Sequence, residues 1–393
     1  MGGVFVKANP SNDFPDDNSG LAPPESISNS EVKRSSADGS VGFPHVRVGH
    51  RQDSFASNPS WVRGFFLEGY RMMASRMSDN EVEIFLAELF SRGDVRASGW
   101  PSDLPVSVAD LGFEIDLKAG RLSVAEPVIE LDIPYLKDTL AKAEPSLNVQ
   151  YSRLVSSTNT MMVDSYSKGN SSDSLFLCEF QYEGRGRRGK TWRSPYASTI
   201  MFSLGMKVPK SQKPIKGLSC ALGLSIAKTL ISLGISNVSV KWPNDVYIDG
   251  RKVCGILVEL VSFNSDDSAV VIGVGLNYRL TKNYIDLIDK PSTDLASHGI
   301  QKSRSEVLRS LVEKLCEDFR RFTDSGFSVF RDDFNGIHWL TDRLVEISQG
   351  AGSVTSGIVA GVNGEGELLL RKGDQEVPII AGEISLIGTR DGT

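Results

Sequence analysis

The sequence predicts an α+β protein built around a mixed β-sheet with helices packed on it, and three patterns support this prediction. Residues 146–335 alternate apolar, strand-like runs with amphipathic helical segments. After residue 340, short alternating strands are separated by glycine-rich turns, which is the pattern of a small β-barrel. Before residue 145, one amphipathic helix and one hairpin predict a small α/β module.

The expected elements of the central region follow from periodicity and from the residues that interrupt it. Strands are expected at 148–157, 174–181, 199–206 and 269–278, with a hairpin at 239–260. Helices are expected from Thr160 onward, at 216–234, and at 303–322, where Ser303 and Glu306 form a capping box. In the preceding module, residues 113–124 alternate around Lys-Ala-Gly as a hairpin, and Asp132 is expected to cap a short helix that has Pro134 in its first turn.

The first 76 residues are predicted to be a disordered extension. Residues 1–60 are rich in Ser, Asn, Asp, Pro and Gly and show no sustained apolar period. Acidic side chains in this stretch argue against a transit peptide, and Met77 is a hypothetical start site just before the first periodic segment. From Glu81 apolar residues recur at helical spacing, and they stop at Gly93.

Composition limits the classes of function. The chain has 393 residues and a formal net charge of −6, which argues against a general nucleic-acid or membrane-surface binder. The four cysteines form no CxxC pair and the four histidines are scattered, so neither disulfides nor a structural zinc site is expected. No apolar run approaches the roughly 20 residues of a membrane-spanning helix. The sequence therefore predicts a soluble cytoplasmic protein.

The stretch EGRGRRGKTW, residues 183–192, concentrates positive charge on a glycine-rich loop between two apolar strands. It has three interpretations: a solvated surface loop, a nucleic-acid contact, or a loop that wraps a phosphate-bearing small molecule. Glycines let the backbone approach a ligand closely, and arginine forks match phosphate and carboxylate oxygens. The Walker pattern GxxxxGK[ST] is absent, and a GxGxxG match alone is a weak signal.

The hairpin KWPNDVYIDGRKVCG places a carboxylate beside an ammonium. Asp249–Gly250 is a preferred two-residue turn, which would pair Ile248 with Arg251, Tyr247 with Lys252 and Asp245 with Cys254. In that register Asp245 and Lys252 are diagonal neighbours on one face. The pair is either a surface ion pair of little energetic value or, because apolar residues flank it, part of a site at the edge of a core.

Two further short segments allow both a structural and a functional interpretation. In RLVSSTNT, Ser157, Thr158 and Asn159 can cap a helix, and the same groups could orient a polar ligand. In GVGLN, the glycines between Gly273 and Asn277 can mark a bulge or a close approach to an adenine or ribose.

Taken in order, the segments STN, EFQYEGRGRRGKTW, KWPNDVY, GRKVCGILVEL, GVGLN and STDLASHG resemble the biotin–protein ligases. The resemblance covers residues 146–393 and implies a mixed-sheet catalytic domain of the biotin/lipoate ligase type, at 146–340, followed by an SH3-like barrel at 341–393. Upstream, DLGFEIDLKAGRLSVAEPVIELDIPYLKDTL is similar to the wing and linker of ligases that also act as biotin-operon repressors. Residues 77–145 are therefore expected to form a degenerate winged-helix-like module.

The activity that the resemblance implies has two steps. Biotin and Mg-ATP give biotinyl-5′-adenylate, which then acylates one lysine of a biotin carboxyl carrier domain. A lipoate or octanoate ligase would share the fold but lack the GRGRRG loop, and a biotin-responsive repressor would need a basic recognition helix. The resemblance leaves a homodimer open and gives no reason to expect a membrane partner.

The resemblance also implies roles for individual residues. The proposed catalytic residues are Arg187, Asp245 and Lys252. Biotin contacts are expected from Ser157, Thr158, Asn159, Gln181, Gly184, Arg185, Gly186, Arg187, Lys252, Gly255 and Gly273. ATP and adenylate contacts are expected from Arg188, Lys190, Trp192, Lys241, Asn244, Asp245, Gly275 and Asn277, with Asp245 as the Mg²⁺ ligand. We further hypothesise that Asp245 helps to deprotonate the acceptor lysine while Lys252 stabilises the acyl oxygen.

Two features depart from the family pattern. Lys190 stands where an arginine is more usual in bacterial members, and a lysine lacks the bidentate fork. The segment Arg92 to Asp110 contains two prolines, is not basic and is too short for the two helices of a winged-helix DNA reader. Operator binding is therefore not expected.

Overall fold

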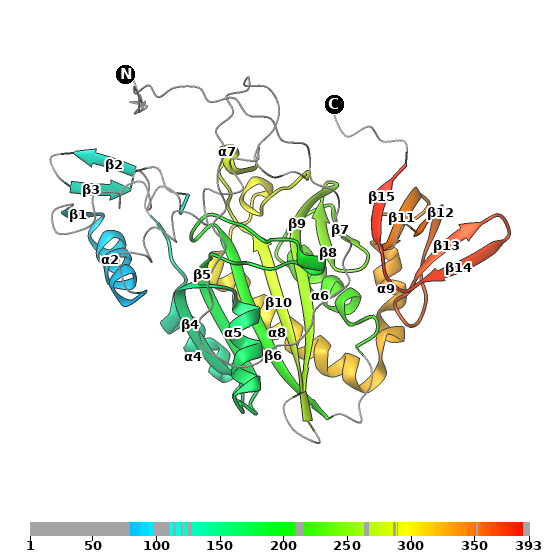
Figure 1. Cartoon of the computed structure of the whole chain (residues 1–393), viewed down its shortest axis with the longest axis horizontal. Coiled ribbons are helices and arrows are strands. Elements are labelled where there is room, and N and C mark those ends of the chain that lie inside the picture. The colour runs from blue at the N-terminus through cyan, green and yellow to red at the C-terminus, as the bar shows by residue number, and fades with distance from the viewer. Residues whose placement is uncertain are drawn as a thin grey trace, which may run out of the picture. The chain divides into compact units, whose positions relative to one another are not determined.

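The computed structural model describes residues 79–96, 111–112, 115–118, 121–124, 128–209, 215–262, 267–285, 288, 290–350 and 353–387 (Figure 1). The predicted disordered extension and the hypothetical start at Met77 lie outside these residues. Within the described part of the chain, no helix is long and apolar enough to cross a membrane.

The described residues at the start of the N-terminal module form one helix and three short strands. Helix α2 (Asp79–Arg92) is followed by β1 (Asp94–Arg96), β2 (Ile115–Lys118) and β3 (Arg121–Val124), in the sheet order β1-β3-β2. As predicted, the helix stops at Gly93, which has a left-handed φ of 77° and bonds back to Leu89 O at 2.9 Å. The predicted hairpin is confirmed by the antiparallel pairing of β2 with β3.

A seven-stranded mixed sheet forms the centre of the molecule, as predicted. Its strands are β4 (Asn148–Val155), β5 (Ser174–Gln181), β6 (Thr199–Pro209), β7 (Val238–Lys241), β8 (Asp245–Ile248), β9 (Arg251–Ser262) and β10 (Asp267–Asn277). Their order is β4-β5-β6-β10-β9-β8-β7; β4 and β5 are parallel and the other neighbours are antiparallel.

Helices cover both faces of this sheet. Successive strand residues point to opposite sides, so each face contributes side chains to a different core. The longer helices are α4 (Ile133–Ala143), α5 (Thr158–Ser167), α6 (Leu218–Ser232) and α8 (Arg304–Ser325). Leu175 and Leu177 join the core that contains α4, α6 and α8, whereas Phe176 and Cys178 join a smaller core with α5. The short helices α7 (Lys282–Ile285) and α9 (Arg331–Gly336) lie in connections.

The predicted caps explain where these helices begin. The Asp132 side chain accepts from Tyr135 N at the start of α4, and Ser303 and Glu306 form the capping box of α8. Helix α5 begins at Thr158, two residues before the predicted start, because Ser157 is its N-cap.

The C-terminal strands form a five-stranded antiparallel sheet. They are β11 (Leu344–Gly350), β12 (Ser353–Val362), β13 (Leu368–Lys372), β14 (Gln375–Ile379) and β15 (Glu383–Leu386), in the order β14-β13-β12-β11-β15. Their buried side chains, such as Val345 and Leu368, belong to the same apolar core as α6 and α8. One continuous core therefore connects the central sheet with the C-terminal sheet.

Candidate active site

The basic loop between β5 and β6 folds back on itself. Gly186 N bonds to Lys190 O at 2.6 Å and Trp192 N bonds to Gly184 O at 2.8 Å. Arg188 and Gly189 both have positive φ, 54° and 73°, which allows the tight reversal at the tip. A side chain at Gly184 would overlap Trp192 O, so this position requires glycine. The loop thus presents its cations from a compact backbone.

A cavity of about 740 Å³ lies beneath this loop. The loop, the start of α5, the turn before β8, strands β9 and β10, and β15 all contribute to its walls. Every residue predicted for the site lines it except Gly184, which lines a smaller adjoining depression in the loop. The fold therefore brings segments that are far apart in the sequence to one place, while their individual roles remain predictions.

One end of the cavity is a buried polar cluster. Gln181 Oε1 accepts hydrogen bonds from Thr158 N at 2.7 Å and from Thr158 Oγ1 at 3.1 Å. Ser203 Oγ donates to Asn159 Oδ1 and lies 2.8 Å from Thr158 Oγ1. Asn159 lies against Gly273, where a Cβ would overlap its amide. These donors and acceptors can orient a small polar ligand group.

The predicted carboxylate–ammonium pair is present: Lys252 Nζ donates to Asp245 Oδ1 at 2.7 Å, and both side chains are about three-quarters buried. The predicted partner of Asp245, however, is wrong. The structure pairs Tyr247 with Lys252 and Ile248 with Arg251 as expected, but Asp245 faces Gly255 instead of Cys254 because the register shifts between Val246 and Tyr247.

The register shift leaves Val253 of β9 without a partner in β8. Lys252 itself still faces Tyr247 across the ladder, and its backbone N donates to Pro291 O while its O accepts from Thr293 N, each at 2.9 Å. Such a bulge inserts one unpaired residue into a strand and can redirect a neighbouring side chain. Here it accompanies the direct contact between Lys252 and Asp245.

Cations of the loop and of the KWPN turn face the same space. Arg187 Nη1 donates to Asn244 Oδ1 at 2.8 Å, and Asn244 in turn donates to Ile256 O at 2.7 Å. Burial lowers the pKa of Arg187, and it also lowers the pKa of Lys241. Neighbouring cations act in the same direction on both groups. A cavity that gathers partly buried cations in this way is suited to a polyanion.

Two aromatic contacts support these cations. The Lys241 ammonium lies 5.5 Å from the ring centre of Tyr247 and 5.4 Å from that of Trp339, within the range of a cation–π contact. The Trp192 ring lies against Gly275, and its buried Nε1 has no hydrogen-bond acceptor among the described residues. Since buried donors are nearly always satisfied, a ligand acceptor in the cavity would complete this site.

The KWPN turn is held in place by hydrogen bonds to residues near the C-terminal end of the chain. Trp242 N donates to His338 Nε2 at 3.3 Å, and Trp242 Nε1 donates to Gly366 O at 2.8 Å. Burial lowers the pKa of His338 to about 4, so the ring is neutral at pH 7 and can accept this bond.

Two acidic residues that the sequence did not reveal hold the loop cations. Arg185 pairs with Glu259 at 3.0 Å, and Lys190 pairs with Glu383 at 2.6 Å. The hydrogen bond from Lys190 lowers the pKa of Glu383. Glu259 was detectable, because it shares a strand face with Gly255. Glu383 is the first residue of β15 and had no recognisable signal in the sequence.

The side chains of the site are better suited to a metal ion that is brought in by a substrate than to a permanently bound metal ion. Among the described residues, no group of three or more His, Cys, Asp or Glu side chains could hold a metal. Asp245 and Glu383 are the carboxylates that line the cavity among those described. Mg²⁺ is commonly bound by one or two carboxylates together with substrate phosphates, and Asp245 could supply such a ligand.

A mixed sheet with a basic glycine-rich loop over a cavity, and a lysine–aspartate pair inside it, is typical of a protein that binds a small anionic ligand. The sequence profile of the Biotin/lipoate A/B protein ligase family matches residues 151–277, and that of the Biotin protein ligase C terminal domain matches residues 343–387. The chain belongs to the biotin protein ligase family.

Individual relatives agree with this assignment. The bifunctional ligase/repressor BirA of Salmonella typhimurium is 32% identical over 281 residues, 71% of this chain and 86% of the relative. BirA of Escherichia coli is 29% identical over 322 residues, which are 79% of this chain and 98% of the relative. The structure of biotin protein ligase from Aquifex aeolicus in complex with biotin and ATP matches with a TM-score of 0.52 and 25% identity, covering 61% of this chain and 98% of that one.

Proposed function

We propose that the protein is an ATP-dependent biotin–protein ligase that forms biotinyl-5′-adenylate and transfers biotin to a lysine of a biotin carboxyl carrier domain. The observation that carries this proposal is the convergence of the basic loop and the Lys252–Asp245 pair on one cavity, in a chain of this family. The similarity to ligases named for biotin and acetyl-CoA carboxylase supports the choice of acceptor.

In the first step, a biotin carboxylate oxygen attacks the α-phosphorus of ATP and pyrophosphate leaves. Arg187, Arg188 and Lys190 would neutralise the phosphates, which otherwise repel the carboxylate. Lys252 would hold the carboxylate, and the polar cluster around Thr158 would hold the opposite end of biotin. A bound Mg²⁺, carried by the ATP phosphates and held by Asp245, would supply further charge neutralisation there.

In the second step, the acceptor amine attacks the acyl carbon of the adenylate and AMP leaves. A free lysine is about 1 part in 2,500 deprotonated at pH 7, so a group that removes its proton is useful. We assign that role to Asp245, with Lys252 stabilising the acyl oxygen. Water is kept out by the loop segment Gly184–Arg187, the expected lid over the intermediate.

The finer division of the chain is also a proposal. Residues 77–145 would be a degenerate winged-helix-like module, 146–340 the catalytic domain and 341–393 an SH3-like barrel. A helix next to a three-stranded sheet supports the first, and five short antiparallel strands support the last. Helix α2 carries Asp79, Glu81, Glu83 and Glu88 against one basic residue, Arg92. This acidic balance opposes DNA-phosphate binding, and we do not propose an operator-binding function.

The test is ATP-dependent transfer of labelled biotin to a purified carrier domain. Arg187→Ala is expected to lower kcat/KM about 100-fold or more, as loss of one charge-stabilising donor does in other enzymes. Arg251→Ala is the matched control, because Arg251 is exposed next to Lys252 but does not line the cavity. Transfer of lipoate or octanoate instead of biotin would reject the substrate assignment, and equal activity of the two variants would reject the role of Arg187.

A further inference from the structure

Both ends of the basic loop are embedded in the core of the N-terminal module. Phe180 lies just before the loop and Tyr196 just after it, and they are 1% and 2% exposed. Both belong to one apolar cluster with module residues, namely Val82, Phe85, Leu86, Leu89, Val95, Leu111 and Leu122. The base of the loop therefore packs against α2 and its sheet in addition to the central sheet.

Tyr196 has three separate links to this part of the molecule. Its backbone N–H donates to Leu111 O at 2.8 Å, and its ring centre lies 5.2 Å from that of Phe90 on α2. Its hydroxyl donates to the carboxylate of Glu130, in the segment that connects the module to α4. Because Trp192 of the cavity lies only four residues earlier, the position of Tyr196 limits where the end of the loop can be.

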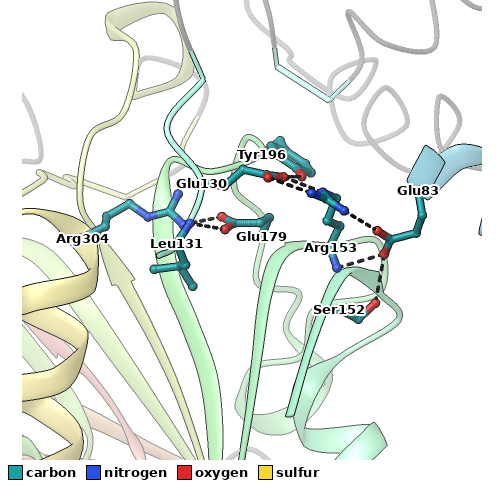
Figure 2. Close-up of polar contacts among 8 residues, drawn as sticks. All are labelled: Glu83, Glu130, Leu131, Ser152, Arg153, Glu179, Tyr196 and Arg304. Atoms are coloured by element: carbon teal, nitrogen blue, oxygen red, sulfur yellow. Dashed lines mark hydrogen bonds and ion pairs between the residues drawn. The ribbon is translucent and has the colours of Figure 1, made fainter. Parts of the chain in front are cut away.

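A chain of charged groups continues from Glu130 to α2 (Figure 2). Arg153 on β4 donates to Glu130 twice, at 2.8 and 3.0 Å, and to Glu83 Oε2 at 3.2 Å. Glu83, on α2, also accepts from Arg153 N at 3.0 Å and from Ser152 Oγ at 3.3 Å. Arg153 and both carboxylate side chains are at least 70% buried, so these bonds are less screened than surface ion pairs.

Leu131, the residue next to Glu130, is held by a separate set of contacts. Leu131 N donates to Glu179 Oε1 at 2.6 Å, and Glu179, which is fully buried, pairs with Arg304 at the start of α8 (Figure 2). Glu130 is thus held between the body of the catalytic sheet and Arg153, and this arrangement leaves its carboxylate aimed at the Tyr196 hydroxyl.

We propose that the N-terminal module is a positioning element of the ligase, which sets the position of the basic loop through Glu83, Arg153, Glu130 and Tyr196. A helix whose charge opposes DNA binding thereby acquires a role in catalysis. The proposal rests on the ligase function proposed above. These four side chains do not line the cavity, so their effect on the reaction passes through the loop.

The experiment compares full-length wild type with Glu83→Gln and Tyr196→Phe, which are near-isosteric changes at the two ends of the chain of contacts. Asp94→Asn is the matched control: it removes the Arg121 ion pair within the same module, which does not touch the loop. The readouts are the adenylate released free per ATP consumed, kcat and KM for ATP, and the Tm. Assays are run well below the lowest Tm.

Loss of a hydrogen bond to a charged group changes an equilibrium constant by about tenfold. We therefore expect Glu83→Gln and Tyr196→Phe to release about three- to tenfold more free adenylate than wild type. Asp94→Asn should match wild type. A lower Tm with an unchanged free-adenylate fraction would show that the contacts are purely structural and would overturn the proposal. If wild type itself makes no adenylate, the proposed function fails instead, and the two failures are thereby separated.

Discussion

The base and the tip of the basic loop are held by different kinds of contact. At the base, Phe180 and Tyr196 are buried in an apolar core and linked to partly buried ion pairs. At the tip, Arg185 and Lys190 have half-exposed side chains, each paired with one carboxylate. Buried packing is worth several kcal/mol, whereas exposed ion pairs contribute about 0–1 kcal/mol. The difference indicates a fixed base and a tip that can exchange its carboxylate partners for a ligand's phosphates.

The largest expected effect is on the base. Phe180→Ala should lower the free energy of unfolding by about 3–5 kcal/mol, because it leaves a cavity between the module and the sheet. Denaturant unfolding measures this effect, with Ile129→Ala as the control, since Ile129 is 75% exposed. A loss below about 1 kcal/mol would mean that the base is not fixed by packing.

A second effect concerns the anchor of the KWPN turn. His338 has a pKa of about 4 in the folded protein because it is buried, against about 6.5 when unfolded. The unfolded state therefore binds more protons between these values, so stability is complete above pH 6.5 and falls as the pH drops towards 4, by at most about 3 kcal/mol.

The check is the difference in unfolding free energy between pH 7 and pH 4.5 for wild type and His338→Gln. We expect His338→Gln to reduce this difference. An equal pH dependence in the two proteins would assign the acid sensitivity to other groups.

The smallest effect is expected at the tip. Glu383→Gln should change the Tm little, because the ion pair with Lys190 is half-exposed. It should lower KM for ATP by about twofold at low salt, since Lys190 no longer has to leave a carboxylate, and the gain should fade at high salt. A large drop in Tm would contradict the view that the tip is loosely held.

The sequence predicted most of the fold because its signals were local. Helical periodicity, the Asp132 and Ser303 caps and the Asp249–Gly250 turn each determine a structure within a few residues, and each is confirmed. The order of the motifs along the chain also allowed us to predict, as one group, the residues that line the cavity.

What the sequence did not reveal depends on contacts between distant residues. The predicted pairing of Asp245 is wrong because Val253 is an extra, unpaired residue in β9, next to the contacts of Lys252 with residues 291–293, and no local pattern predicts this bulge. Glu383 was missed for the same reason, since its partner Lys190 is almost two hundred residues earlier. The burial of Phe180 and Tyr196 by the N-terminal module likewise depends on tertiary packing alone.

The continuous core between the central and C-terminal sheets has a consequence for protein engineering. Val345, Ile347 and Val359 are fully buried in that core. A truncation near residue 340, or a split-enzyme design cut there, would expose apolar surface on both fragments and favour aggregation. The C-terminal sheet is thus a poor candidate for exchange between ligases as an independent cassette, and chimaeras should carry its contact residues on α6 and α9 along with it.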